Sequence, residues 1–286
     1  MDILADETEE AGYKFYYVNG VLNAHEIFSY PTGATTDPNN GSIKRMYNGI
    51  SYAKAYDMNG NTDNQAKYVA IEAPANGTWI LLFGDVTGSQ TFEVTVSSTS
   101  GNVVKSFKAG DDGIMVVPVT KDVTYTAKQT ESDYNGKARL VYAEFVPTVE
   151  PKNGGNYRIR NVKTGLYVEV EDANKNNGSK IKTGQYSYDD KKNDFKFIAE
   201  GEYFNIYPQL DYSNNKDGVQ MIDLDRTNNI IQTYSSSSNS NMPYRQFRFV
   251  KNDTNGTYKI YKYYGSKLQE DIELAKGIIV NEPELI

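Results

Sequence analysis

The chain has 286 residues, contains no cysteine and carries a formal net charge of −7 with a pI near 5.0. An acidic chain is a poor partner for nucleic acid or an anionic membrane, and a chain without cysteine has no disulfide framework. No apolar run reaches the roughly 18 residues of a membrane span, so we expect no membrane insertion. The length predicts two domains.

The N-terminal half has the pattern of a β-sandwich. Residues 1–10 are acidic and polar, unlike a signal peptide, and we expect a disordered leader there. Residues 11–148 contain short alternating or β-branched runs separated by turn signals, which predict an antiparallel sandwich with Trp79 and Phe83 in its core. No segment has the periodicity of a helix. The clearest strand runs are residues 68–73, 79–86, 91–98, 114–119 and 139–146.

A linker and then a repeat follow. Residues 149–155 lie in the segment PTVEPKNGG, whose two Pro and two Gly disfavour a sheet and indicate a domain boundary. Three similar units then begin at Tyr157, Tyr203 and Tyr258, and the first two close on NDFKF and RQFRF. Self-similarity at a period of roughly 40–50 residues indicates one supersecondary unit that is used repeatedly. Since each copy reads as short strands, we expect a threefold β structure.

The first repeat resembles a ricin B-type lectin domain, a β-trefoil also grouped as carbohydrate-binding module family 13. The similarity lies in NYRIRNVKTGLYVEV, then NNGSKI, then NDFKF. It implies that residues 156–286 form a β-trefoil. The family's closing Q-x-W/F element is altered, because Asn193 and Arg245 replace its Gln in repeats one and two. The residues that match the family pattern are Asn161, Thr164, Gly165, Val168, Val170, Gly178 and Ile181.

The third repeat is shorter than the family pattern requires. A trefoil of this kind has twelve strands, of which eleven can be placed in this sequence. The last strand, expected after Glu282-Pro283, has no evident counterpart. We therefore expect the trefoil to lack its final strand, unless the tail or another segment completes it.

The resemblance implies one shallow sugar site per repeat, built from an acid, an aromatic ring and an amide. In the first repeat these positions are occupied by Glu169, by Tyr186 or Tyr188, and by Asn193. A carboxylate accepts strong hydrogen bonds from hydroxyl groups, a ring stacks on the C–H face of a sugar, and an amide both donates and accepts. The chemistry of the three positions therefore suits carbohydrate.

The other two repeats depart from this arrangement. In the second, Asp223 occupies the acidic position and Tyr234 is the candidate ring, but Arg245 stands where an amide is expected. In the third, Gln269 replaces the acid. The alternative interpretation for all three repeats is that these side chains are ordinary solvated loop residues.

The sandwich has a weaker likeness to accessory β-sandwich modules of bacterial enzymes that degrade pectin and other plant cell-wall polymers. The likeness is carried by NGISYAKAYDMNG and YVAIEAPANGTWILLFGD. If this domain binds glycan, exposed rings and neighbouring polar groups are its candidate contacts, with basic side chains available for an acidic sugar. These candidates are Tyr47, Tyr52, Tyr56, Asp57, Lys54 and Arg45.

The residues needed for common enzyme chemistry are scarce. His25 is the only histidine, and the sequence contains neither a nucleophile elbow nor a phosphate-binding loop. We expect no catalytic residue and no cofactor. The pairs Asp111-Asp112 and Asp189-Asp190 offer oxygen ligands for Ca²⁺, but neither loop has a complete ligand spacing, which favours simple turns.

The sequence predicts a non-catalytic carbohydrate-binding protein. Its expected ligand is polysaccharide, first of the plant cell wall and second of a host. It would be a lectin, or the binding portion of a secreted or surface-bound bacterial enzyme with a covalently attached catalytic domain. Two alternatives remain: a polysaccharide lyase or glycoside hydrolase with a site between the domains, and a cell-surface adhesion protein.

Overall fold

Strands make up almost all of the regular structure. Among the described residues the one helical element is a 3₁₀ helix, η1 (Glu171–Ala173), and no helix there is long and apolar enough to cross a membrane. Two compact units divide the chain, residues 1–147 with 254–256 and residues 148–253 with 257–286. The computed structural model describes residues 2–5, 13–16, 28–29, 45–47, 49–52, 56–58, 68–84, 91–132, 137–147, 149–187, 189–214, 220–225, 230–235, 245–252, 256–264 and 270–281.

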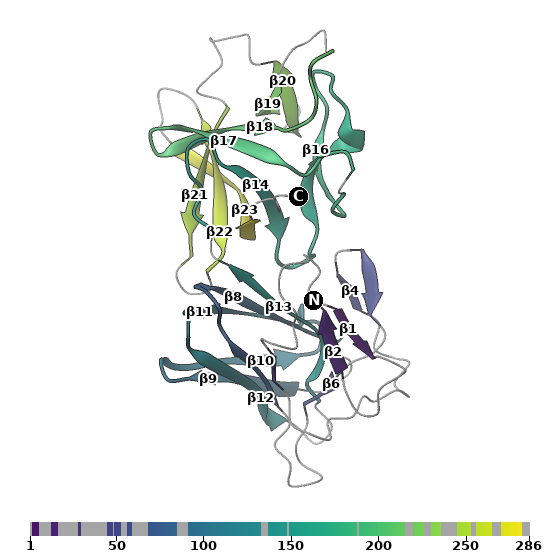
Figure 1. Cartoon of the computed structure of the whole chain (residues 1–286), viewed down its shortest axis with the longest axis vertical. Helices are drawn as coiled ribbons and strands as arrows, with labels where there is room; N and C mark the ends of the chain where they lie inside the picture. Colours follow the sequence, from purple (N-terminus) through teal and green to yellow (C-terminus); the bar gives the residue numbers. More distant parts are fainter. Residues whose placement is uncertain are drawn as a thin grey trace. The chain divides into compact units, whose positions relative to one another are not determined.

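The first unit is an antiparallel β-sandwich (Figure 1). Its strands are β1 (Asp2–Ala5), β2 (Tyr13–Tyr16), β3 (Phe28–Ser29), β4 (Arg45–Tyr47), β5 (Ile50–Tyr52), β6 (Tyr56–Asp57), β7 (Tyr68–Glu72), β8 (Gly77–Phe83), β9 (Thr91–Ser98), β10 (Gly101–Lys108), β11 (Ile114–Val119), β12 (Thr124–Ser132) and β13 (Arg139–Pro147). One sheet has the order β11-β8-β13-β1-β2, with β6 also paired to β13. The other has the order β10-β9-β12-β7-β3, and β4 pairs with β5 separately.

Aromatic rings join the two sheets. Phe83 of β8 lies 5.7 Å from the ring centre of Phe92 and 5.3 Å from that of Phe107, which belong to the opposite sheet. Every residue of β8 is buried, so both faces of this strand are covered. The expected core positions, Trp79 and Phe83, are both fully buried, which confirms that prediction.

Two features of the N-terminal segment differ from expectation. Residues 2–5, expected in a disordered leader, form β1, whose backbone pairs with β2. Tyr47, expected as an exposed ring, is only 1% exposed, because it packs at 4.9 Å against the Tyr142 ring. Tyr47 is therefore a core residue of this unit and is unavailable for stacking on a sugar.

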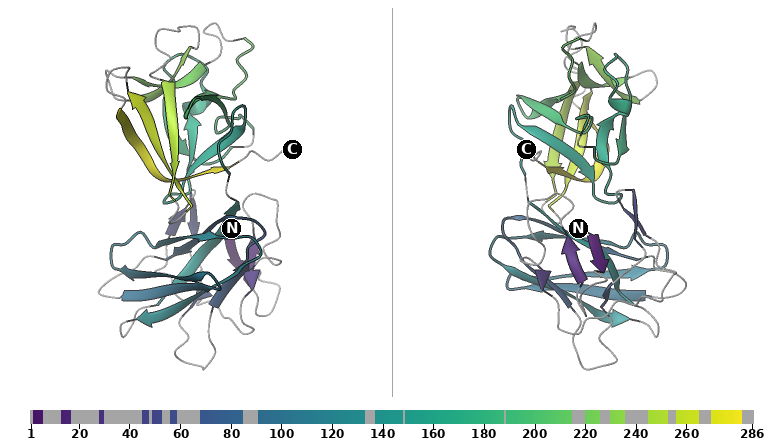
Figure 2. Two further views of the ribbon diagram at one scale, coloured as in Figure 1. Left: turned by 90° about the vertical axis from the view of Figure 1, so that its left-hand side faces the viewer. Right: turned by 45° about the vertical axis from the view of Figure 1, so that its right-hand side comes forward.

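The second unit is a β-trefoil built on a closed six-stranded sheet (Figure 2). The strands of this closed sheet, which we call the strand ring, follow the order β14-β17-β18-β21-β22-β23. The sheet is closed because β23 also pairs with β14. Two hairpins, β15–β16 and β19–β20, extend from this ring. The strands are β14 (Asn156–Asn161), β15 (Tyr167–Val170), β16 (Ile181–Gly184), β17 (Phe195–Glu200), β18 (Tyr203–Pro208), β19 (Gln220–Asp225), β20 (Ile230–Ser235), β21 (Gln246–Lys251), β22 (Tyr258–Tyr264) and β23 (Glu270–Asn281). The predicted all-β fold, a sandwich followed by a trefoil, is confirmed.

The three repeats share one core but are not equal. Repeats one and two have four strands each, whereas the described residues of repeat three form two long strands, β22 and β23. The first part of β23 pairs with β22, and its last residues, Ile278 to Asn281, pair with β14. The ring is closed by Asn281, so the strand sought after Glu282-Pro283 is not needed for closure.

The core is assembled from the same positions of each repeat. The Phe197 ring is 4.8 Å from Tyr157 and 5.1 Å from Phe249, which joins repeats one and two. In β17 the buried Phe195 and Phe197 alternate with the exposed Lys196, as expected for a strand with one face in the core. The buried cluster consists of Tyr157, Ile159, Val170, Phe195, Phe197, Ile206, Leu210, Tyr212, Ile222, Phe247, Tyr258 and Ile260.

Candidate functional site

The β19–β20 hairpin belongs to the second repeat (Figure 1), and one of its two faces packs against the core of the trefoil through Ile222 and Ile231. Its register places Met221 opposite Tyr234 and Asp223 opposite Gln232, so these four side chains share one face. The intervening Ile222 is buried in the core of the trefoil. The predicted acid and the predicted ring of this repeat therefore lie on the same side of the same hairpin.

A single guanidinium group supports this face. Arg245, the residue before β21, is fully buried, and its Nε lies 3.3 Å from Asp223 Oδ2. Its Nη1 is 3.6 Å from Met221 Sδ, and its Cζ is 5.1 Å from the ring centre of Tyr234. Arginine cannot lose its charge in a protein, so burial of this group requires the nearby carboxylate. Arg245 thus fixes the positions of three side chains of the hairpin.

The second-repeat cluster, which we define as Asp223, Tyr234 and Arg245, remains partly open. The Tyr234 residue is 39% exposed, and 13% of the Asp223 side chain is accessible. An exposed ring beside an ionised acceptor offers one apolar surface and one strong hydrogen-bond acceptor. The cluster can therefore contact a ligand that has a C–H face next to hydroxyl groups.

The acidic side chain of the first repeat is more deeply buried than that of the second. Glu169 of β15 is 3% exposed, and its carboxylate lies 3.3 Å from Lys192 Nζ and 3.7 Å from Lys182 Nζ. Gly184 lies directly across the hairpin face from Tyr167, and a Cβ at Gly184 would overlap the Glu169 carboxylate. The carboxylate is thus packed over a glycine and paired with two lysines.

Lys182 connects this buried acid with two more exposed ones. Its Nζ lies 3.4 Å from Glu171 and 3.9 Å from Asp172, in addition to Glu169. Desolvation works against the charged amine, but the hydrogen bond to Glu171 and the charges of all three acids raise the pKa of Lys182 above its ordinary value. The side chains around Lys182 are therefore predominantly acidic, and they leave no net positive charge for an anionic ligand.

The predicted ring and amide of the first repeat serve different structural roles. The Tyr186 ring has the Arg158 guanidinium 4.0 Å from its centre, and Arg158 pairs with Asp194 at 2.7 Å. Asn193 is fully buried, where its Oδ1 accepts from the backbone amide of Ser187 and its Nδ2 donates to the carbonyl of residue 168. The side-chain amide of Asn193 therefore links the loop at Ser187 to β15 through these two hydrogen bonds.

The remaining predicted residues are only partly described. Tyr188, Gln269 and Lys54 lie outside the described residues. Tyr52 pairs with Arg45 in β4–β5, and Tyr56 of β6 pairs with β13, but only their backbone is described. A carbohydrate contact through these positions stays a prediction, as it does for Glu169, Tyr186 and Asn193.

The acidic turns have ordinary turn chemistry where they are described. Asp111 accepts a hydrogen bond from the Lys108 amide at 2.8 Å, and Asp190 accepts one from the Lys192 amide at 3.2 Å. Within the described ranges, no three His, Cys, Asp or Glu side chains are grouped closely enough to hold a metal ion.

Sequence reasoning did not identify the basic partners of the two acids. Lys182 stands directly opposite Glu169 in the hairpin register, a position that a strand-pairing argument could have found. Lys192 comes from a loop and carries no such local signal. Arg245 was noted only as a departure from the family pattern, although it organises the second-repeat cluster.

No protein-family model matches the chain, and no curated protein matches it. Among solved structures, the designed threefold-symmetric protein ThreeFoil is 16% identical over 46% of this chain and 91% of its own, with a TM-score of 0.31. A structure from work on glycan recognition by the Ruminococcus flavefaciens cellulosome is 18% identical over 45% and 86%, with a TM-score of 0.29. A GlcNAcα1-4Gal-releasing endo-β-galactosidase from Clostridium perfringens is 11% identical over 99% and 100%, with a TM-score of 0.32. Likeness at this level says nothing about a ligand.

Proposed function

We propose that the protein binds carbohydrate without chemically changing it, and that the second-repeat cluster is its principal contact. The observation that carries this proposal is the half-open Tyr234 ring on the same hairpin face as Asp223, with both held by the buried Arg245. A ring fixed before binding loses little conformational freedom when a sugar stacks on it. In this proposal the second unit acts as a ricin B-type lectin domain.

The mechanism is recognition at a shallow site. The Tyr234 ring covers the C–H face of a pyranose, and Asp223 accepts a hydrogen bond from a hydroxyl group on the same sugar. Such a site binds weakly, because the hydroxyl groups give up good hydrogen bonds to water. On a polymer, further sites on the chain raise the overall affinity through effective concentration.

This mode of binding suits a polymer outside the cell. We propose plant cell-wall polysaccharide as the ligand and a secreted or cell-surface location for the protein. In that setting the chain serves as a lectin or as the binding portion of a larger glycan-degrading enzyme.

The proposal is tested by native gels that contain soluble polysaccharides such as pectin, xylan, arabinogalactan and β-glucan. At least one polymer should retard the wild-type chain, and both Asp223→Asn and Tyr234→Ala should reduce that retardation by roughly tenfold in affinity. Tyr203→Ala is the matched control, because Tyr203 also lies beside an arginine, with its ring centre 5.9 Å from Arg248 Cζ. This control should migrate like the wild type.

Two results would contradict the proposal. Unchanged retardation of both cluster variants would place the ligand elsewhere on the chain. Release of reducing ends or unsaturated products during incubation with the retarding polymer would show that the protein is an enzyme, contrary to the proposed role.

A further inference from the structure

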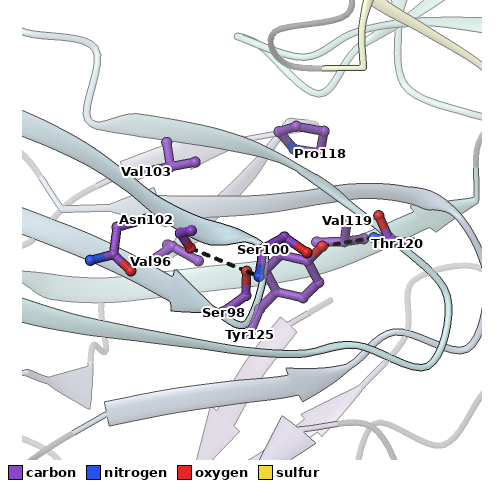
Figure 3. A pocket seen from close by; sticks show the side chains of 10 residues that line it. Val96, Ser98, Ser100, Asn102, Val103, Pro118, Val119, Thr120 and Tyr125 are labelled. Atoms are coloured by element: carbon purple, nitrogen blue, oxygen red, sulfur yellow. Dashed lines mark hydrogen bonds between the residues drawn. The ribbon is translucent and has the colours of Figure 1, made fainter.

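A hollow of about 300 Å³ opens in the sandwich unit, where β9 and β11 end and β10 and β12 begin. Figure 3 shows the side chains that line it. It is lined by residues of β9, β10, β11 and β12 and by the turns next to them. β10 and β11 stand at the ends of the two sheet orders, so the hollow lies where the open edges of the two sheets meet. Its volume is at the lower end of the range for small-molecule sites.

The hydroxyl group of a largely buried tyrosine faces this hollow with only part of its hydrogen-bonding capacity used. Tyr125 is 6% exposed, and its Oη accepts a hydrogen bond from the Thr120 amide at 2.9 Å (Figure 3). Among the described residues this is the only hydrogen bond of the phenol, so its own proton has no acceptor there. An acceptor atom of a ligand in the hollow can take the proton of this hydroxyl group.

The rim offers further polar groups. The Ser100 and Thr120 hydroxyl groups and the Asn102 amide are exposed at the hollow, and within the described part of the chain these side chains make no hydrogen bond. Ser98 is already engaged, since it donates to the Gly101 carbonyl and accepts from the Ser100 amide. The free groups can both donate and accept, which is the pattern that sugar hydroxyl groups require.

The remaining wall is apolar and uncharged. Val103 and Pro118 line one side, and Val103 is 40% exposed. Among the described residues that line the hollow, none is a lysine, arginine, aspartate or glutamate. An ionic ligand would therefore lose hydration without gaining an opposite charge, whereas a purely aliphatic ligand would leave the Tyr125 hydroxyl unmatched.

We propose that this hollow is a second carbohydrate site, which takes one neutral pyranose unit. The apolar wall contacts the C–H face of the sugar, the Tyr125 hydroxyl donates to a ring or glycosidic oxygen, and the rim groups bind its hydroxyl groups. The site lies in the sandwich and does not depend on the second-repeat cluster of the trefoil.

The test uses backbone amide NMR spectra of the ¹⁵N-labelled full chain. The probes are the methyl glycosides of glucose, galactose and mannose, with sodium galacturonate as the charged counterpart. At least one neutral glycoside should shift the amide signals of Ser100, Asn102 and Thr120. Tyr125→Phe keeps the ring but removes the donor, and it should weaken binding several-fold.

A matched pair of variants localises the site. Val103→Trp fills the hollow and should weaken binding at least tenfold. Val104→Trp is the same substitution one residue along β10, where Val104 is 53% exposed and does not line the hollow. This control should bind like the wild type.

The outcomes separate this proposal from the trefoil site. The double variant Asp223→Asn/Tyr234→Ala should keep the shifts at Ser100, Asn102 and Thr120, even if it abolishes retardation by polysaccharide. The sandwich site is overturned if no neutral glycoside shifts these amide signals, if Val103→Trp leaves the shifts intact, or if the double variant removes them. Stronger binding of galacturonate than of every neutral probe would overturn the assigned ligand class.

Discussion

Arg245 and Asp223 form an ion pair in which the arginine is fully buried and the Asp223 side chain keeps 13% of its surface accessible, with 3.3 Å between Nε and Oδ2. The pair is therefore asymmetric: the cation is structural, and the anion reaches the surface. Because the guanidinium keeps its charge, the ion pair holds the Asp223 carboxylate in one orientation. This relationship makes Asp223 a preorganised acceptor instead of a mobile surface carboxylate.

Arg245→Met should destabilise the trefoil strongly. Removing one partner of a buried pair typically costs about 3–5 kcal/mol, and the other partner here is partly accessible, so we expect about 2–4 kcal/mol. Urea unfolding measures this loss. Arg248→Met is the control, since Arg248 pairs with the exposed Glu202 and should cost far less. Equal losses for the two variants would mean that burial does not distinguish the two arginines.

Glu169→Gln should affect stability more than carbohydrate binding. The carboxylate is 3% exposed and paired with Lys182 and Lys192, so its loss leaves two amines without their shared partner. We expect a decrease of about 1–2 kcal/mol in the free energy of unfolding. Retardation by polysaccharide should stay within about twofold of the wild type, an affinity change of roughly 0.4 kcal/mol. Loss of retardation with unchanged stability would instead assign a sugar contact to the first repeat.

Two glycines of the trefoil should respond differently to alanine. A Cβ at Gly155 would overlap the ring of Tyr157, which is buried and whose hydroxyl accepts a hydrogen bond from the Lys152 amide, so Gly155→Ala should cost about 1–3 kcal/mol. At Gly184 the Cβ meets only the end of the Glu169 side chain, which can rotate away. Gly184→Ala should therefore cost less and should weaken the pairing with Lys192. Thermal unfolding of both variants checks this order, and the reverse order would contradict it.

Stability should fall at alkaline pH in part through Tyr258. Burial, followed by the nearby Glu150 and Tyr157, raises the pKa of Tyr258 from 10.0 to about 12. Between these values the unfolded chain releases this proton while the folded chain retains it, so the stabilisation present below pH 10 is lost as the pH rises toward 12.

The Tyr258→Phe variant isolates this contribution from that of the other tyrosines. It loses the hydrogen bond from Tyr258 to the Val149 carbonyl, so it should be about 1 kcal/mol less stable at neutral pH. Its stability should then decline less steeply than that of the wild type above pH 10. Parallel curves from urea unfolding at several pH values would show that Tyr258 does not titrate as expected.

The local pattern of residues was enough to identify the longer strands of the sandwich, although not β1. Alternating runs between turn residues predicted the strands of the sandwich, because side chains of a strand point to opposite faces. The recurring positions of Tyr157, Tyr203 and Tyr258 predicted the repeats, and β18 and β22 begin at the last two of them. Phe195 and Phe247 lie in the core for the same reason: each repeat contributes equivalent apolar residues to one shared interior.

The sequence by itself determined that the chain is all-β and that its second half repeats, because strand alternation and turn chemistry are local. Only the tertiary structure decided which acid is open and which is buried. Asp223 and Glu169 occupy equivalent hairpin positions, yet the buried Arg245 supports one while Lys182 and Lys192 enclose the other. Burial and pairing depend on side chains that arrive from distant strands and loops, and no local pattern contains that information.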